Sequence, residues 1–277
     1  MNEPAAFPIP ILAYHTIAER PGDAIAPFAV TPDALARHLD LVVAGGHVAL
    51  TVAQLVDRLG GAAPLAPGTV VITFDDGFED NLTVAAPMLL DRGLSATVFV
   101  TTGFLTGGSE HPYPSPGRML AWSDLAALEE AGIEVGSHAH THRQLDVLTH
   151  PEAAREIRLS KHLLEDALHH PIPSLAYPHG YASRWIEHEV RCCGFRAACG
   201  VRNALSHPQD NRWRLARLTV AATTTVEQVA GWLSGMAAPV ASRHEQFRTK
   251  AWRGARRAGA VCARVSSRIG ARPGSAS

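Results

Sequence analysis

The sequence is poor in cysteine and has no long apolar run, and both shortages exclude classes of protein. Its four cysteines have neither the spacing of a zinc ribbon nor that of a disulfide framework. No apolar stretch reaches the roughly eighteen residues that a membrane-spanning helix needs. The first residues also lack the basic segment followed by an apolar one that marks a secretory signal peptide. We therefore expect a cytoplasmic protein with reduced thiols.

Strong net charge is also missing, but the charges are unevenly distributed. The formal net charge is −1, yet the segment 243–277 holds nine Arg and Lys residues against the single Glu245. The rest of the chain is therefore acidic, which argues against a nucleic-acid partner. Basic and apolar residues alternate in that segment at helical spacing, which predicts a basic amphipathic helix or flexible tail over 241–277. It could contact the inner face of a membrane, dock on an acidic partner or pack back on the preceding domain.

Residues 1–240 read as a single α/β domain. Apolar, β-branched runs predict strands over 9–15, 47–50, 69–73, 97–101, 134–137, 174–177, 197–200 and 218–222. Helical periodicity and capping residues predict helices over 32–43, 52–59, 82–91, 124–130, 151–168, 183–192 and 226–236. This alternation predicts a distorted (β/α)7-type barrel, in which functional residues follow the carboxyl ends of the strands.

Two adjacent carboxylates come at the end of a predicted buried strand. Thr73 and Phe74 are followed by Asp75, Asp76 and Gly77. A turn at Gly77 would allow both carboxylates to reach one pocket, so that one binds a metal while the other stays free. The alternative is that Asp-Asp-Gly is only a turn.

A second polar cluster follows another predicted strand. His138 comes directly after 134–137, and a one-turn step would bring His142 to the same side. Two imidazoles and one carboxylate make a facial metal site with open positions for water and substrate. Zinc is the first candidate, with cobalt, nickel or iron as alternatives. In a chain with 15 histidines, a solvated histidine loop is the competing interpretation.

Together these motifs resemble the NodB-homology polysaccharide deacetylases of the carbohydrate esterase family four superfamily. The resemblance covers roughly residues 10–225. It implies that Asp75 is the general base and that Asp76, His138 and His142 are the metal ligands. His140 matches no family role.

The third family motif is altered. Ala176 stands where the family has an arginine that orients the catalytic aspartate. Tyr177, Pro178 and His179 would still form a turn that offers a backbone N–H to substrate or oxyanion. Arg217 is our substitute for the missing arginine, although it could equally be a surface charge near a strand. Trp213 could line the cleft.

The C-terminal His motif of the family is missing, yet the first predicted strand ends in Tyr14-His15. This resembles the permuted branch that deacetylates poly-N-acetylglucosamine, and the resemblance implies that His15 is the general acid. The alternative is a buried, structural histidine.

These residues allow amide hydrolysis, and we expect a metal-dependent hydrolase that removes N-acetyl groups from a polysaccharide or glycoconjugate. A cytoplasmic location would favour a lipid-linked, nucleotide-linked or small sugar substrate. Two other functions stay open, namely an amidohydrolase acting on a non-sugar amide and a catalytically silent carbohydrate-binding protein.

Overall fold

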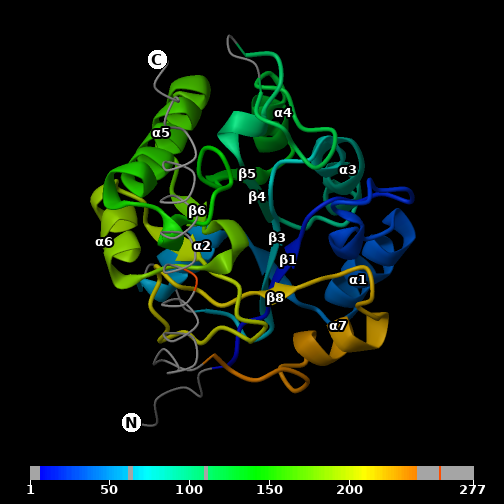
Figure 1. The fold of residues 1–277 in the computed structure, drawn as a ribbon. Coiled ribbons are helices and arrows are strands. Elements are labelled where there is room, and N and C mark those ends of the chain that lie inside the picture. Colours follow the sequence, from blue (N-terminus) through cyan, green and yellow to red (C-terminus); the bar gives the residue numbers. More distant parts are fainter. Residues whose placement is uncertain (1–6, 62–64, 109–111, 242–255, 257–277) are drawn as a thin grey trace, which may run out of the picture.

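The computed structural model describes residues 7–61, 65–108, 112–241 and residue 256. Its centre is a curved parallel sheet with helices outside it (Figure 1). The strands are β1 (Ile11–Tyr14), β2 (Val48–Leu50), β3 (Thr69–Phe74), β4 (Ala96–Val100), β5 (Ile133–Ser137), β6 (Ser174–Ala176), β7 (Ala197–Cys199) and β8 (Leu218–Thr219). The α-helices are α1 (Pro32–Ala44), α2 (Val52–Leu59), α3 (Ala86–Leu90), α4 (Asp124–Glu130), α5 (His150–Leu168), α6 (Arg184–Cys192) and α7 (Val226–Leu233).

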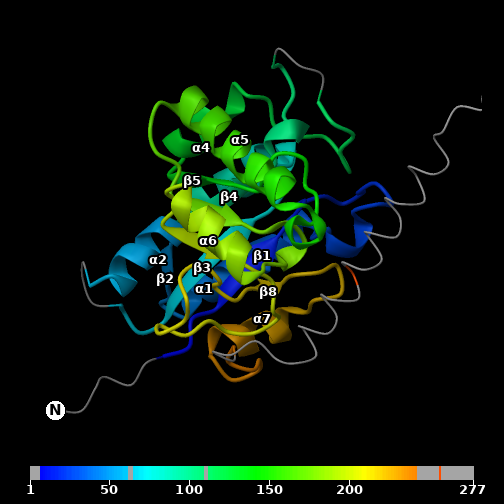
Figure 2. The same ribbon diagram turned by 60° about the vertical axis from the view of Figure 1, so that its left-hand side comes forward.

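The strand order is β7-β6-β5-β4-β3-β1-β8, and β2 pairs with the first half of β3. Every pairing between these strands is parallel. Figures 1 and 2 show α4 and α5 at one end of the sheet and α7 at the other. Because every pairing is parallel, the carboxyl ends of these strands all lie along one edge of the sheet, which we call its carboxyl edge. Functional residues of such folds gather at this edge.

The two outermost strands of the sheet, β7 and β8, approach each other through the segment before β8. Leu215 donates its N–H to the carbonyl of Ala198 in β7 at 2.9 Å, and Gly200 donates to the carbonyl of Leu215 at 2.8 Å. The same segment continues into β8, which pairs with β1. The sheet thus curls toward closure, and the predicted distorted (β/α) barrel is confirmed.

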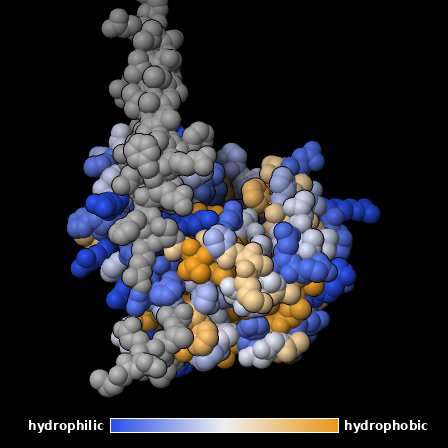
Figure 3. Space-filling model, turned by 90° about the horizontal axis from the view of Figure 1, so that it is seen from below, coloured by the Kyte–Doolittle hydropathy of each residue, from blue (hydrophilic) through white to orange (hydrophobic). Residues whose placement is uncertain are grey.

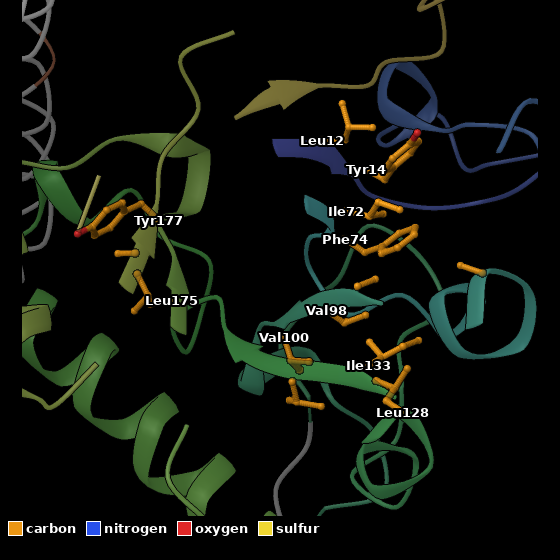
Figure 4. Packing of buried hydrophobic residues seen from close by; sticks show 14 of the residues in the cluster. Leu12, Tyr14, Ile72, Phe74, Val98, Val100, Leu128, Ile133, Leu175 and Tyr177 are labelled. Carbon is orange, nitrogen blue, oxygen red and sulfur yellow. The ribbon is translucent and has the colours of Figure 1, made fainter. Parts of the chain in front are cut away.

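Local sequence explains why these elements form where they do. All six residues of β3 are buried, as expected for a strand of a parallel sheet covered on both faces. Thr51 caps α2 in a capping box with Gln54, and Thr225 does the same for α7 with Gln228. Phe74 is fully buried and stacks on Tyr14 with ring centroids 5.4 Å apart (Figure 4), so truncating it would cost about 3–5 kcal/mol.

One predicted helix differs from the structure. In place of a regular helix over 82–91, a π-helix covers Asn81–Ala85 and precedes α3. Pro87 lacks the N–H that a regular helix would need at that position, and a widened turn avoids the missing bond. No helix in the described part of the chain is long and apolar enough to cross a membrane.

The predicted basic helix over 241–277 lies outside the described residues except at its first residue and at Arg256. The Arg256 guanidinium contacts Asp146, with Nη2 2.8 Å from Oδ2, and stands 3.6 Å above the ring of Tyr181. Asp146 is fully buried. At this one residue, the C-terminal segment therefore contacts the barrel.

Candidate active site

Strand β3 delivers two adjacent carboxylates to the carboxyl edge of the sheet. Asp75 and Asp76 are 3% and 4% exposed. Asp76 has φ of 75° and Gly77 has φ of 87°, so the chain leaves the extended conformation directly after the strand. The turn brings both carboxylates to the same imidazole: His138 Nε2 is 3.9 Å from Asp75 Oδ2 and 3.5 Å from Asp76 Oδ1.

Arg217 holds one of these two carboxylates. Its Nη1 is 2.6 Å from Asp75 Oδ1 and its Nη2 is 2.7 Å from Asp75 Oδ2, a two-bond fork. Arg217 is fully buried, which excludes the alternative of a surface charge. It also donates to the Thr73 hydroxyl at 3.0 Å and to the Gly200 carbonyl at 3.1 Å. Burial alone would raise the pKa of Asp75, but Arg217 and His138 hold that pKa well below its usual range.

The second carboxylate lies in a three-residue cluster. The Nε2 atoms of His138 and His142 are 3.5 Å and 3.2 Å from Asp76 Oδ1. One ligand atom from each of the three side chains lies within 4.8 Å of the others. Asp76 Oδ1 is buried and makes no hydrogen bond of acceptable geometry to any described residue.

This cluster has the properties of a metal site. The Nδ1–H of His138 donates to the carbonyl of Ala176 at 2.8 Å, so Nε2 presents its lone pair to the cluster. Burial lowers the pKa of His138 to about 4, so the ring is neutral and able to bind a metal at neutral pH. Burial would raise the pKa of Asp76, yet the adjacent His142 and His138 keep it below its ordinary value. Two imidazole nitrogens and a carboxylate fit zinc, cobalt, nickel or iron.

A buried glutamate on α5 fixes the loop between the two histidines. Glu156 accepts from the N–H of His140 at 3.1 Å, the N–H of Thr141 at 2.7 Å and the hydroxyl of Thr141 at 2.6 Å. His140 itself points elsewhere, because its Nδ1 lies 2.9 Å from the hydroxyl of Thr102. Glu156 was not among the predicted site residues. It shares the buried face of α5 with Ala153, Ile157 and Ser160, where a carboxylate is unexpected.

Left-handed backbone is concentrated at the site. Four of the six described non-glycine residues with positive φ are Asp76, Ala139, His142 and His179. Each such residue costs about 1–3 kcal/mol and persists only where surrounding contacts impose it. Hydrogen bonds such as those to Glu156 supply these contacts. The loops therefore hold the site residues in place, although their left-handed residues lower the stability of the local backbone.

His15 follows β1 and lies beside the same carboxylates. Burial raises the pKa of both carboxylates, and His15 makes the smallest of the contributions that lower the pKa of Asp75, after Arg217 and His138, and of Asp76, after His142 and His138. The Nδ1 atom of His15 is buried and has no hydrogen-bond partner among the described residues.

The segment that carries His15 is anchored to the start of the π-helix. The fully buried Asn81 donates its amide to the His15 carbonyl at 2.9 Å. Asp80 accepts from the N–H of Ile17 at 2.9 Å and from the hydroxyl of Thr16. The sequence alone did not indicate a role for Asp80 or Asn81, because they follow the Asp-Asp-Gly turn and belong to no periodic pattern.

The altered third motif forms a tight turn next to the cluster. The His179 ring lies 4.7 Å from the His142 ring, centroid to centroid, and burial and His142 lower the pKa of His179. The N–H of Tyr177 donates to Cys199 at 2.9 Å and that of Gly180 to Tyr177 at 2.7 Å. Pro178 has no N–H. Within the described residues, the N–H of His179 is therefore the one backbone donor of the turn Tyr177–Gly180 that makes none of these bonds.

Trp213 does not join this group of side chains. Its indole N–H points to the carbonyl of Phe195 at 3.4 Å, and the guanidinium carbons of Arg191 and Arg212 lie 5.3 Å and 5.2 Å from its ring centroid. Its link to the motif is its backbone carbonyl, which accepts from the Tyr177 hydroxyl at 2.8 Å.

Comparison with known proteins connects this geometry to a family. Residues 62–198 match the family model described as polysaccharide deacetylase. YxkH of Bacillus subtilis (strain 168), assigned to the polysaccharide deacetylases, is 28% identical over 172 residues, which are 62% of this chain and 57% of that protein. The chain therefore spans little more than half the length of this curated relative.

Solved structures share the fold. The deacetylase PplD of Streptococcus pyogenes, in complex with acetate, superposes with a TM-score of 0.72 at 22% identity over 84% of this chain and 99% of that one. IcaB of Ammonifex degensii gives a TM-score of 0.69 at 20% identity over 82% and 97% of the two chains. At these identities the likeness concerns the fold.

Proposed function

Because the chain belongs to the polysaccharide deacetylase family, hydrolases of N-acetyl amide bonds, we propose that it is a metal-dependent deacetylase of an N-acetylated saccharide. The observation that carries the proposal is the different environment of two adjacent carboxylates. Asp75 is held by the Arg217 fork, whereas Asp76 faces two imidazoles. A binding protein would have no need of a second, separately held carboxylate.

The cluster of Asp76, His138 and His142 is proposed to hold one divalent metal, zinc first among the candidates. When bound there, such a metal supplies a Lewis acid that polarises the acetyl carbonyl and acidifies water. The His138 bond to the Ala176 carbonyl supports this role, because metal-bound histidines ordinarily donate their other N–H in this way.

Asp75 is proposed as the general base. Its depressed pKa keeps the carboxylate ionised at neutral pH, and the Arg217 fork fixes both of its oxygens. In this role Asp75 receives a proton from the attacking water.

His15 is proposed as the general acid and His179 as an oxyanion donor. His15 would protonate the departing sugar amine from the β1 side of the site, with its backbone held by Asn81. The N–H of His179 is suited to the oxyanion because the neighbouring donors of the turn are engaged elsewhere.

The identity of the acylated amine and the cellular location stay proposals. A sugar substrate agrees with the family, and we propose a cytoplasmic setting together with it. A non-sugar amide remains the second candidate, because Ala176 departs from the family motif and the metal residues do not select the substrate.

The proposal is tested by acetate release from N-acetylglucosamine oligomers and from nucleotide-linked and lipid-linked N-acetyl sugars, using zinc-loaded protein. Asp75→Asn is expected to abolish release while metal is still bound, and His15→Ala to reduce it strongly. Absence of release from every sugar by metal-loaded wild-type protein would overturn the proposed function.

A further inference from the structure

Exposed aromatic side chains are rare in the described part of the chain, and two of them border the site. Those classed as strongly exposed are Phe7, Phe28 and Tyr113, at 54%, 40% and 48%. Apolar exposure alone does not mark a site, because apolar residues also reach the surface on the face seen from below (Figure 3). What distinguishes Phe28 and Tyr113 is their contact with histidines of the two active-site segments.

Phe28 lies on the β1 side of the site. It ends the short 3₁₀ helix Ala26–Phe28 in the connection from β1 to α1. Its ring centroid is 5.0 Å from that of His15, at an interplanar angle of 36°. The backbone around it is fixed, because the Phe28 N–H donates to the Ile25 carbonyl at 2.9 Å. Phe28 is therefore a held, half-exposed ring next to the proposed acid.

Tyr113 lies on the opposite side. Its N–H donates to the carbonyl of Gly103, just after β4, at 2.6 Å. Its ring meets the His140 ring edge-to-face at 5.6 Å. Gly103 in turn donates to the His140 carbonyl at 2.7 Å. These contacts fix Tyr113 over the ends of β4 and β5, on the rim formed by the histidine loop.

The strand order places the reaction centre between these two rings. The order β5-β4-β3-β1 puts Tyr113 at the β5-β4 end and Phe28 at the β1 end, with Asp75 and Asp76 following β3 between them. A ligand that touches both rings must cross both carboxylates. A single sugar centred on the carboxylates would leave both rings uncovered.

We propose that Phe28 and Tyr113 are sugar-stacking platforms on either side of the reaction centre, and that they make the protein prefer a substrate of at least three sugar rings to a single N-acetylated sugar. This inference rests on the proposed function and adds two residues that determine its preference for substrate length. The apolar C–H face of a pyranose packs flat on an aromatic ring, and such rings gain by being covered because exposed aromatic surface is costly in water.

The test compares Phe28→Ala, Tyr113→Ala and the double variant with wild type on N-acetylglucosamine and its pentamer. We expect kcat/KM for the pentamer to fall about tenfold per ring, as burial of roughly 55 Å² of apolar surface predicts, mainly through KM. The loss of kcat/KM on the monomer should be clearly smaller, because a single sugar leaves both rings uncovered. Tyr113→Phe should keep wild-type behaviour, and Phe7→Ala is the matched control because Phe7 is the third exposed aromatic.

Equal losses on monomer and pentamer would mean that the rings only support the histidines, and would overturn the platforms. So would unchanged pentamer kinetics, or a wild-type preference for a nucleotide-linked sugar over the pentamer.

Pentamer binding to metal-loaded Asp75→Asn protein, measured by calorimetry, separates this inference from the proposed function. Binding that weakens in Phe28→Ala and Tyr113→Ala, without any acetate release by wild type, would support the platforms and overturn the activity. Failure of the pentamer to bind would overturn the platforms.

Discussion

Replacing Arg217 with leucine should destabilise the protein in a way that depends on pH. The variant leaves the Asp75 carboxylate buried without its fork of bonds at 2.6 Å and 2.7 Å. Because both side chains are almost completely buried, at 0% and 4% exposure, screening by water is small. Removing one partner of a buried ion pair costs about 3–5 kcal/mol, and we expect a loss near the middle of that range at pH 7.

The pH dependence follows from the protonation of Asp75. In wild type its pKa is depressed, so its stabilisation is present above the unfolded carboxyl pKa of about 3.9 and is lost only as pH falls through the folded value. Burial raises the pKa of Asp75 and nearby positive charges lower it. Without Arg217 fewer charges oppose burial, so the pKa of Asp75 in the folded variant rises. The difference between wild type and variant should therefore be smallest near pH 4 and grow toward neutral pH.

Urea unfolding of metal-free protein between about pH 4 and pH 8 measures this difference. Arg217→Leu combined with Asp75→Leu is the matched control, since replacing both members of a buried pair with apolar residues is often neutral. A loss that is equal at acid and neutral pH, or a double variant as unstable as the single one, would refute the reasoning.

Three further predictions concern residues that support the site or the barrel without belonging to the proposed catalytic group. Glu156→Gln removes the carboxylate that orders the histidine loop and should weaken zinc binding about 10–100-fold in a chelator competition; an equal effect of Glu130→Gln, on the exposed part of α4, would contradict it. Asn81→Ala should lower kcat about tenfold with KM nearly unchanged, because the bond to the His15 carbonyl is lost, and a changed KM alone in steady-state kinetics would argue against a role through His15. Arg256→Ala should reduce the free energy of unfolding in urea by about 2 kcal/mol, since the buried Asp146 loses its fork, whereas an unchanged midpoint would show that this contact does not stabilise the barrel.

Most of the fold could be predicted because its signals are local. The buried β-branched run of β3 and the capping boxes of α2 and α7 depend only on neighbouring residues. The π-helix could not be predicted, because Pro87 indicates an irregularity without giving its form. Positions after strands also led to Asp75, Asp76 and His138, since the carboxyl edge of a parallel sheet collects such residues.

The remaining residues of the site act across long distances in the sequence, so Arg217 was predicted only as one of two alternatives and Glu156 was not predicted. Arg217 reaches Asp75 over 142 positions, and nothing near it in the sequence shows that it is buried rather than exposed. Glu156 is recognised only when the buried face of α5 is known. Phe28 and Tyr113 lie in the connections between regular elements, where no periodic pattern links them to the site.

The position of β1 between two neighbouring strands has a consequence for synthesis. β1 lies between β3 and β8, and β8 leaves the ribosome about 200 residues after β1. At roughly 5–20 residues per second, that interval lasts on the order of 10–40 s. One side of β1 therefore stays unpaired while about 200 further residues are synthesised, and Asp75 meets Arg217 only after that interval. The nascent chain thus lacks the Asp75–Arg217 pair, and is open to chaperones that bind unpaired strands, until β8 has emerged.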